Sequence, residues 1–446
     1  MTDSPRPHGA PDESADVIVV GAGPGGSATA AYLASAGLDV LLLEKARFPR
    51  DKICGDGLTP RAVRELAQLG VSTREEDGWI RNKGLRIVGG GRTFTLDWPE
   101  TDHFPPYGMV RKRAELDEIL ARHAAARGAR LLEGVNVQEA IRGRSGRIEG
   151  VTAKLNGPDG RATGETRTYR APVVVAADGV SSRLSASMGR PKRDDRPMGV
   201  AVRTYYESPA RSDDDYMESW LELWVPEDPH ADPADPDTKK ILLPGYGWLF
   251  ACGDGTTNVG LGMLDTSPAF GQVDYRDVMR RWVATLPADW TLTPQTMTAP
   301  IRGAALPMAF NRQPLYADGL LLVGDAGGMV NPFNGEGIDY ALEAGRTAAE
   351  IIVQAHARAD DAGRERVLAS YNTVMKNHLG GYYTLGRGFA ALIGKPEVMR
   401  LCVKYGLPLT PLMRVLLKTM ANLAEPKGGR FDDRLIQTLT RLAPSA

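Results

Sequence analysis

The sequence Asp16-Val-Ile-Val-Val-Gly-Ala-Gly-Pro-Gly-Gly26 joins a short apolar run to a glycine-rich turn. A segment of helix-forming composition follows as far as Ala36, and a second apolar run, Val40–Leu43, ends at Glu44. A strand, a glycine turn, a helix and a second strand closed by an acid are typical of a unit that binds a dinucleotide. We therefore predict an α/β fold of the Rossmann-like type around this segment.

Each glycine of the turn has its own structural task. Gly21 permits the tight turn, Gly23 lets the backbone approach a pyrophosphate, and Gly26 lets the helix pack against the strand. Gly25 belongs to the same predicted cradle, at the helix N-terminus that faces the phosphate charge. Glu44 ends the second strand, where its carboxylate can accept hydrogen bonds from a ribose. An ordinary glycine-rich turn would leave the acid at this position without a reason.

Composition excludes several classes of protein. The 446 residues carry a formal net charge of −1 and contain no basic block, which argues against a nucleic-acid partner. The cysteines Cys54, Cys252 and Cys402 are too scattered for a disulfide framework or a zinc site, so we expect no metal and a reducing, cytoplasmic location. No apolar run reaches membrane-spanning length. Residues 1–15 are polar and lack a signal-peptide core, so we expect a disordered tail.

The apolar runs predict three parts after this tail. A strand that ends in Gly324-Asp325, followed by a helix, indicates that the nucleotide-binding part returns late in the chain. The strands expected before it are rich in aromatic and β-branched residues, as in an antiparallel sheet. The expected boundaries are 16–78, 107–190 and 300–360 for the nucleotide-binding domain, 79–106 and 191–299 for an antiparallel-sheet substrate domain, and 361–446 for a helical C-terminal region.

Several elements are expected at defined positions. A helix is predicted over residues 110–127 from its apolar spacing. Strands are predicted over 198–207, 218–225, 241–250 and 257–264. Glycine and proline are the commonest interruptions of helices. The C-terminal helices are therefore expected to break at Gly380-Gly381, Gly394–Pro396, Gly406–Pro408 and Pro426–Gly429.

Four further motifs accompany the glycine turn, at Val110–Asp117, Ala177–Arg183, Pro244–Phe250 and Gly324–Ile338. Together they resemble the geranylgeranyl reductase family of FAD-dependent oxidoreductases, over about residues 15–350. The resemblance implies FAD as the cofactor. It also implies an FAD-binding domain of the aromatic-hydroxylase flavoprotein type, interrupted by the sheet of the substrate domain.

The resemblance assigns the flavin end of the site to the last of these motifs. Asp325, which follows Gly324, would accept hydrogen bonds from the ribityl hydroxyls, although an aspartate here could instead cap a helix. Gly335, Gly337 and Ile338 would present N–H groups at a helix start. They would face the end of the flavin ring that gains negative charge on reduction.

The resemblance places other cofactor contacts on the remaining motifs. Arg113 falls at the family position that reaches the FAD phosphates, and a surface cation of a helix is the alternative. Asp178 resembles the aspartate that supports the FAD chain and, in some relatives, NADPH, but it could instead cap the next turn. Val137 matches the position that packs by the adenine. Lys45, which follows Glu44, completes the predicted cofactor-binding set.

The segment Cys54-Gly-Asp-Gly57 resembles the family's loop beside the isoalloxazine ring. Small residues such as Gly55 and Gly57 let the backbone approach the ring, and Cys54 would lie near the substrate double bond as a catalytic residue. We expect Arg50 and Lys52 to lower the pKa of this thiol. A small buried cysteine that only packs is the alternative.

Tyr246, Trp248 and Phe250 alternate along one predicted strand and therefore share one face. They resemble the family motif that helps to form the tunnel for a prenyl chain, so we expect them to contact substrate. An aromatic strip that belongs only to the hydrophobic core is the alternative.

The resemblance implies reduction of a carbon–carbon double bond in a polyprenyl chain. Reduced FAD would supply hydride, and an acid that the sequence does not single out would supply the proton. Lys52–Pro60 looks most like actinobacterial menaquinone reductases, which saturate one isoprene unit of the menaquinone tail; geranylgeranyl lipids are the alternative substrates. Because only one GxGxxG is present, either NADPH bound transiently or a redox protein would supply the electrons.

Apolar residues of the C-terminal region have two interpretations. Lysine and arginine lie among them, as in a peripheral contact with the inner face of the cell membrane. Alternatively, these helices cover the substrate domain. The residues are Tyr382, Tyr383, Leu385, Phe389, Leu392, Ile393, Leu407, Leu409, Leu412, Val415 and Leu416.

Two other functions fit the same fold. An aromatic monooxygenase or halogenase would use the flavin to activate oxygen, but a halogenase should show a WxWxIP-type segment, and residues 246–251 read Tyr-Gly-Trp-Leu-Phe-Ala. A flavoprotein without catalysis that carries a lipid or quinone is the other alternative.

Overall fold

A six-stranded sheet forms the centre of the nucleotide-binding part in the computed structural model, which describes residues 13–228, 231–232, 235–267, 270–426 and 429–445. The strand order is β21-β22-β13-β2-β3-β9, and all neighbours are parallel except β21 and β22. Its strands are β2 (Val17–Val20), β3 (Val40–Glu44), β9 (Arg130–Glu133), β13 (Val173–Ala176), β21 (Tyr316–Ala317) and β22 (Leu320–Leu322). The inner strands are apolar throughout because helices and a second sheet cover both faces.

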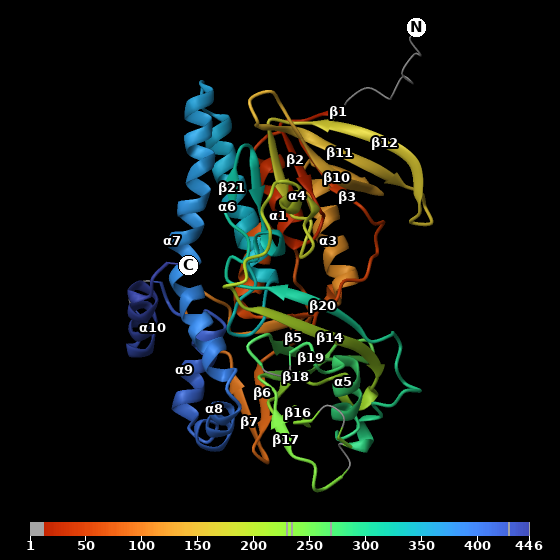
Figure 1. The fold of residues 1–446 in the computed structure, drawn as a ribbon, viewed down its shortest axis with the longest axis vertical. Coiled ribbons are helices and arrows are strands. Elements are labelled where there is room, and N and C mark those ends of the chain that lie inside the picture. Colours follow the sequence, from red (N-terminus) through yellow and green to blue (C-terminus); the bar gives the residue numbers. More distant parts are fainter. Residues whose placement is uncertain (1–12, 229–230, 233–234, 268–269, 427–428, 446) are drawn as a thin grey trace.

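Helices from distant parts of the sequence pack on this sheet (Figure 1). They are α1 (Pro24–Ser35), α3 (Arg113–Ala126) and α6 (Ile338–His356), and α2 (Pro60–Leu69) packs outside them against α6. Helices α1 and α6 approach closely, since a Cβ added at Gly345 would lie 2.6 Å from the carbonyl oxygen of Gly25. The late helix thereby completes the core begun by the first βαβ unit.

A four-stranded sheet of order β1-β12-β11-β10 lies beside the central sheet. Its strands are β1 (Glu13–Ser14), β10 (Val135–Arg142), β11 (Ile148–Asn156) and β12 (Ala162–Arg170). Glu13 and Ser14 pair with Tyr169 and Arg170, so the predicted tail ends before residue 13. The rest of that prediction, residues 1–12, lies outside the described residues.

A seven-stranded sheet of order β20-β14-β19-β18-β15-β6-β7 forms the other half of the molecule (Figure 1). Its strands are β6 (Gly84–Gly89), β7 (Arg92–Asp97), β14 (Met198–Glu207), β15 (Tyr216–Trp220), β18 (Gly245–Ala251), β19 (Thr256–Leu264) and β20 (Arg302–Pro307). Helix α5 (Tyr275–Val283) packs its buried Met279 and Trp282 on one face. A cavity lies on the other face.

Two of the predicted strands are wrong in extent. The stretch 218–225 divides into β15 and β16 (Trp224–Pro226), and 241–250 divides into β17 (Lys240–Leu242) and β18. Strands β16 and β17 pair only with each other. Pro244 has no N–H for a sheet hydrogen bond, so the ladder is interrupted where the chain passes from β17 to β18.

The helix predicted over 110–127 begins later, at Arg113. Val110 belongs instead to β8 (Gly108–Val110), which pairs with β4 (Gly57–Leu58) and β5 (Ile80–Asn82). The helix starts where it does because the Asp56 carboxylate accepts the backbone N–H of Arg113 at 3.0 Å. This acceptor comes from a segment remote in sequence, so helical periodicity could not place the boundary.

Four helices and a π-helical turn form the C-terminal region. They are α7 (Asp361–Ile393), α8 (Pro396–Leu401), the π-helix η5 (Cys402–Gly406), α9 (Thr410–Met420) and α10 (Phe431–Leu442). The predicted breaks at 394–396 and 406–408 are confirmed, and that at 426–429 falls partly outside the described residues. In Figure 1, α7 runs along the side of the molecule, and α8 and α9 lie beside β6 and β7. Within the described ranges, no helix is long and apolar enough to cross a membrane.

The predicted break at Gly380-Gly381 is wrong, because α7 continues through both glycines. A Cβ added at Gly381 would lie 2.1 Å from the carbonyl oxygen of Thr440 in α10. The glycine therefore serves a close helix–helix crossing and not a helix end.

The remaining short elements complete the described chain. They are α4 (Arg183–Ser187) and the 3₁₀ turns η1 (Glu75–Asp77), η2 (Pro209–Arg211), η3 (Ala288–Trp290) and η4 (Gly324–Gly327).

Replacing Gly381 by alanine is predicted to loosen α10, because the added methyl overlaps the backbone of Thr440. We expect a cost of about 1–3 kcal/mol at this crossing, seen as faster hydrogen–deuterium exchange in residues 431–442. Gly388→Ala is the matched control, since its Cβ would meet nothing within 4 Å in the same helix. It should leave exchange in α10 unchanged and stabilise α7 by about 0.5–1 kcal/mol. Equal exchange rates in residues 431–442 of the two variants would contradict the close contact between Gly381 and Thr440.

Candidate active site

A cavity of about 700 Å³ connects the glycine turn after β2 with the C-terminal helices. Its size is in the range of cofactor and ligand sites. One end is lined by backbone and charged groups, and the other by the aromatic strip, methionines and leucines. All the predicted site residues line it except Gly26.

The nucleotide end is formed by the turn between β2 and α1. Gly21 has φ +99°, and a Cβ there would lie 2.4 Å from the carbonyl oxygen of Ala177, so only glycine fits. Gly26 lies behind the cavity, where a Cβ would lie 1.8 Å from the carbonyl oxygen of Gly21, and it has the packing role that its position predicts. The Glu44 carboxylate accepts the N–H of Ala22 at 2.9 Å and is thereby held at the cavity wall.

A cluster of cations lines the middle of this wall. Arg113 is buried and makes two hydrogen bonds to Asp117, of 2.7 and 2.9 Å. Arg50 bridges Asp117 at 2.7 Å and Glu44 at 3.3 Å. The pKa of Lys52 is lowered, first by burial and then, among its charged neighbours, by Arg113 and Arg50. An anion placed here would therefore relieve an excess of positive charge.

The opposite wall contains the strand end at Asp325 and the start of α6. Asp325 is half-buried in η4, directly after β22. Helix α6 begins at Ile338, and no side chain caps its first turn. The N–H of Gly335 is already donated to Asn331 at 2.9 Å, so only Gly337 and Ile338 keep the predicted role of presenting N–H groups here.

Asp178 and Val137 close the nucleotide end. The Asp178 carboxylate accepts the N–H of Leu184 at 3.3 Å, as the capping alternative predicts, while its second oxygen is buried without a partner. Burial raises the pKa of Asp178. Val137 is buried on β10 and faces the same cavity. The capping and cofactor roles of Asp178 are thus compatible, since each uses a different oxygen.

The aromatic strip lines the apolar end. The ring centroids of Tyr246 and Trp248 lie 6.1 Å apart and those of Trp248 and Phe250 6.4 Å apart, so the three side chains share one face as predicted. Tyr246 donates its hydroxyl to the Asn334 carbonyl at 2.7 Å. Trp248 is buried and donates its indole N–H to Asn258 at 2.9 Å.

Comparison with known proteins joins these observations. A family model described as an FAD binding domain matches residues 14–228. Menaquinone reductase of Mycobacterium tuberculosis is 38% identical over 92% of this chain and 92% of the relative, and that of Mycolicibacterium smegmatis is 34% identical over 95% of each. The chain belongs to the geranylgeranyl reductase family of FAD-dependent oxidoreductases.

Solved structures show the same fold. A geranylgeranyl bacteriochlorophyll reductase-like protein from Thermoplasma acidophilum has a TM-score of 0.72 at 21% identity, covering 96% of this chain and all of that one. A flavin-dependent brominase has a TM-score of 0.68 at 18% identity, covering 96% and 98%. The predicted aromatic-hydroxylase type of flavoprotein fold is therefore confirmed.

The residues of the cavity suit FAD, the cofactor of the family. The excess of cations around Lys52 suits a pyrophosphate, and Gly23 leaves room for it, since a Cβ there would lie no nearer than 3.9 Å to the Arg50 guanidinium. The uncapped start of α6 suits an oxygen that gains negative charge on flavin reduction. We propose that Glu44 and Lys45 contact the ribose end, Arg113 and Asp178 the phosphates, Val137 the adenine, and Gly324 and Asp325 the ribityl chain.

Cys54, Gly55 and Gly57 lie at the junction of the two ends. A Cβ on Gly55 would lie 3.1 Å from the Phe250 ring and 3.3 Å from Trp248. One on Gly57 would lie 2.7 Å from the Met217 sulfur. The glycines therefore let this loop lie directly on the aromatic strip.

The predicted lowering of the Cys54 pKa is wrong. Burial raises the pKa of this thiol, and the nearby Arg113 only partly opposes the effect. Arg50, one of the two cations expected beside this thiol, forms ion pairs with Glu44 and Asp117 instead. Cys54 is therefore a protonated thiol at neutral pH and not a thiolate.

Asp56 ties this loop to both halves of the reductase. Its carboxylate accepts the Tyr205 hydroxyl at 2.6 Å, the Asn258 amide at 2.7 Å and the Arg113 N–H at 3.0 Å. The side chain is fully buried. The cysteine loop, the start of α3 and strands β14 and β19 are thus held in one arrangement.

Several cavity residues were not expected as site residues. The apolar end includes residues of β6 and β15 and one face of α9. The spacing of Met413, Leu416, Leu417 and Met420 is that of one helix face, and this signal could have identified them. Other cavity residues that the sequence did not single out include Leu85, Ile87, Met217, Leu221, Val403 and Glu336. The C-terminal helices thus cover the substrate domain, as one of the two interpretations proposed.

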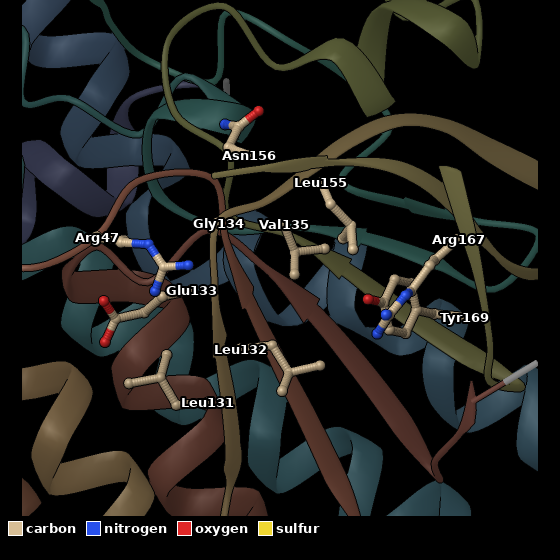
Figure 2. Close-up of a pocket in the computed structure, with 10 residues that line it drawn as sticks. All are labelled: Arg47, Leu131, Leu132, Glu133, Gly134, Val135, Leu155, Asn156, Arg167 and Tyr169. Atoms are coloured by element: carbon tan, nitrogen blue, oxygen red, sulfur yellow. The ribbon is translucent and has the colours of Figure 1, made fainter. Parts of the chain in front are cut away.

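A second pocket, of about 410 Å³, opens on the far side of β9 and β10 (Figure 2). Figure 2 shows Arg47 and Arg167 at its opposite ends. It contains none of the predicted site residues and shares only Val135 with the larger cavity. The motifs of the reductase family therefore gather in a single place, the larger cavity.

The raised pKa of Cys54 predicts slow alkylation by iodoacetamide near neutral pH. Because only the thiolate reacts, the rate at Cys54 should start to rise at a higher pH than that of an ordinary thiol. Exposed Cys402 is the internal control and should react at least about 10-fold faster at neutral pH. Peptide mass spectrometry of the alkylated protein measures both. If the alkylation rate at Cys54 instead rises at a lower pH than that of an ordinary thiol, Cys54 is a thiolate at neutral pH, as the sequence predicted.

Proposed function

We propose that this chain saturates one carbon–carbon double bond in the isoprenoid tail of menaquinone. The observation that carries the proposal is the continuity of one cavity, from the FAD end through the Cys54 loop to a long apolar end. A polyprenyl chain needs apolar walls along its length, and its double bond must reach the flavin. Reduced FAD supplies hydride to such a bond.

The protein's residues supply position and a dry environment. An isolated alkene is a poor hydride acceptor, so its placement must be tight. The rings of Trp248 and Phe250 form one wall, and Met217 and Leu221 of the neighbouring segment lie beside them. Leu416 and Leu417 of α9 form the cover. These walls hold the chain and exclude water from the reacting carbons.

The choice of menaquinone is supported by the relatives. Those named menaquinone reductase are 34–38% identical over at least 92% of this chain. A digeranylgeranylglycerophospholipid reductase of Methanopyrus kandleri is 32% identical over 76% of it. The alignments with the first group leave at most 8% of this chain unmatched, which is less than the length of the C-terminal region, whereas that with the Methanopyrus protein leaves 24% unmatched.

We further propose that NADPH or a redox protein reduces the flavin, since the chain has one GxGxxG and the cavity has one nucleotide end. The site can be reduced chemically with dithionite, so the substrate proposal is testable before the donor is known.

Mass spectrometry of quinones tests the substrate directly. The reduced holoenzyme under nitrogen should convert menaquinone into a product that is heavier by two hydrogens in the tail, with the naphthoquinone ring unchanged. Digeranylgeranyl lipid, offered under the same conditions, should react at least about 10-fold more slowly. Turnover that requires oxygen would favour the monooxygenase alternative, and tight FAD without turnover of any polyprenyl compound would favour a carrier.

We also propose that the segment around α8, η5 and α9 rests on the membrane that holds this substrate. Leu401, Tyr405, Leu409 and Leu412 are exposed there, and Leu412 also lines the cavity. Four exposed basic side chains accompany them: Lys395, Arg400, Lys404 and Arg414. Apolar contact and attraction to anionic lipid would place the apolar end of the cavity at the bilayer surface.

Replacing both Leu401 and Leu409 by aspartate should abolish this contact. Each leucine contributes about 1.5–3 kcal/mol when buried, so flotation with phosphatidylcholine–phosphatidylglycerol vesicles should fall at least about 10-fold. The control is Leu435 and Leu439 changed to aspartate, because these leucines are also exposed, to 42% and 47%, but lie on α10, outside the segment of α8, η5 and α9. Equal flotation of wild type and the Leu401/Leu409 variant would contradict the proposed membrane contact of α8, η5 and α9.

A further inference from the structure

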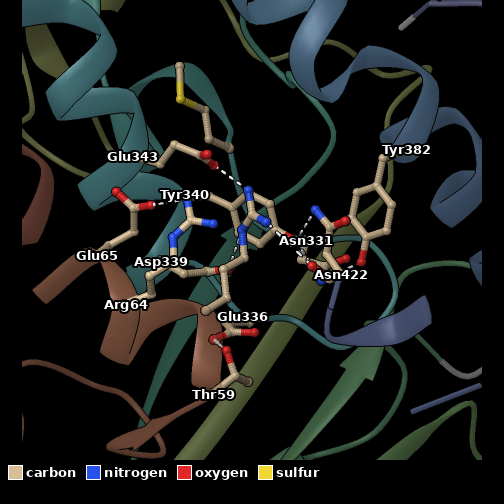
Figure 3. A network of polar contacts seen from close by, with 12 residues as sticks. Thr59, Arg64, Glu65, Asn331, Glu336, Asp339, Tyr340, Glu343, Tyr382 and Asn422 are labelled. Carbon is tan, nitrogen blue, oxygen red and sulfur yellow. Dashed lines mark hydrogen bonds and ion pairs between the residues drawn. The ribbon is translucent and has the colours of Figure 1, made fainter. Parts of the chain in front are cut away.

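A buried acidic cluster lies behind the start of α6, beside the cavity (Figure 3). Figure 3 shows Glu336 next to Thr59, with Asp339 and Glu343 on the helix beside it. Thr59 donates its hydroxyl to one oxygen of Glu336 at 2.6 Å. The other Glu336 oxygen and both oxygens of Asp339 are buried without a hydrogen-bond partner.

Arg61 is the buried cation among these three carboxylates, and the partly exposed Arg346 lies 3.8 Å from Glu343. Arg61 of α2 donates to Glu343 at 2.5 Å, and its Nε lies 3.5 Å from Asp339. Glu343 also contacts the half-exposed His378 of α7 at 2.8 Å. The charge of Arg61 is therefore matched chiefly by Glu343. Glu336 and Asp339 remain as two acids without a second buried cation.

Two neighbouring carboxylates cannot both ionise in a site of low dielectric without such a cation. Burial raises the pKa of Asp339, and the charge of Glu336 adds to the effect. Burial likewise raises the pKa of Glu336 to about 7, against the opposing hydrogen bond from Thr59 and the charge of Arg61. The pair therefore holds at least one proton at neutral pH.

Glu336 alone of the three acids lines the cavity. The groups that face it there are uncharged: Tyr246 of β18, whose hydroxyl is bonded to Asn334, and the protonated thiol of Cys54. Ionised Glu336 or Cys54 would raise the pKa of Tyr246, and all three residues line the cavity at the junction of the flavin and apolar ends. This is where the reacting double bond of the proposed substrate would lie.

We propose that Glu336 is the proton donor for the reduction and that Asp339 shares this proton with it. This inference rests on the proposed function. The π electron pair of the alkene forms a C–H bond with the Glu336 proton, while hydride from reduced FAD brings the second hydrogen and both electrons to the other carbon. The flavin is left oxidised and Glu336 is left as the carboxylate, which solvent reprotonates. Tyr246 and Trp248 face the positive charge that develops on the alkene.

The matched variant is Glu336→Gln, which keeps the volume and an acceptor for Thr59 but carries no acidic proton. We expect FAD binding and flavin reduction by dithionite to be unchanged. Single-turnover alkene reduction should fall about 100-fold or more. In wild type this rate should be highest below pH 7 and fall as Glu336 ionises above it. In the variant it should lose this pH dependence.

Two further variants separate a chemical role from a structural one. Asp339→Asn removes the second acid of the pair, so the falling limb that two coupled acids share in wild type should become the single ionisation of Glu336, a change that packing alone would not cause. Cys54→Ser tests the other candidate donor and should keep the pH profile of wild type. An Asp339→Asn profile identical to wild type, or loss of the profile in Cys54→Ser, would overturn the assignment.

Infrared spectroscopy gives a readout that needs no turnover. A carbonyl band of a protonated carboxylic acid that titrates near pH 7 should be present in wild type and missing from Glu336→Gln. Its absence from wild type at pH 6, or a wild-type rate in the variant, would overturn the proposal. If wild type shows the band but reduces no polyprenyl compound, the proposed function is wrong, and so is the role of Glu336 as proton donor. The inference that Glu336 and Asp339 share a proton would still hold.

Discussion

The buried carboxylate of Asp56 is the contact on which the rest of the arrangement depends. It takes its hydrogen bonds from the first turn of α3, from β14 and from β19, and it sits between Gly55 and Gly57 of the cysteine loop. Burial raises the pKa of Asp56, and the hydrogen bonds from Tyr205 and Asn258 oppose this effect. Any shift of the seven-stranded sheet against the nucleotide sheet would leave buried carboxyl oxygens without these partners, which is unfavourable. The cavity therefore has a single geometry.

The two ends of the cavity have opposite chemistry for this reason. Backbone and cations gather where parallel strands end, because all the carboxyl ends of β2, β3, β13 and β22 lie at one edge. The apolar end is formed by the face of the seven-stranded sheet that α5 does not cover. This sheet was predicted to be antiparallel, but β6 and β15 pair in parallel within it. Asp56 brings the two ends together, so that an anionic cofactor and an apolar chain can meet at Cys54. The acidic pair at Glu336 and Asp339 lies beside the same junction.

Much of the site could be predicted from the sequence, because its motifs act locally. Gly21, Glu44 and Asp325 line the cavity as expected, since each follows a strand whose end is readable from its apolar run. The aromatic strip could be assigned to one face from its alternation alone. The expectations that proved wrong depend on distant partners. Gly381 does not end a helix because Thr440 lies against it, and Cys54 is not a thiolate because its loop is buried under the other half of the molecule.

Short-range patterns thus specify the βαβ unit, the glycine cradle and the family of this reductase, because a turn, a cap or a strand end involves neighbours within a few positions. Burial and long-range contacts are different, since they depend on which remote segments the fold brings together. The start of α3, the cover formed by α9 and the protonation of Cys54 and Glu336 all belong to this second kind. A pKa is set by desolvation and by charges across space. The position of a protonated acid beside the cavity could therefore be read only from the tertiary structure.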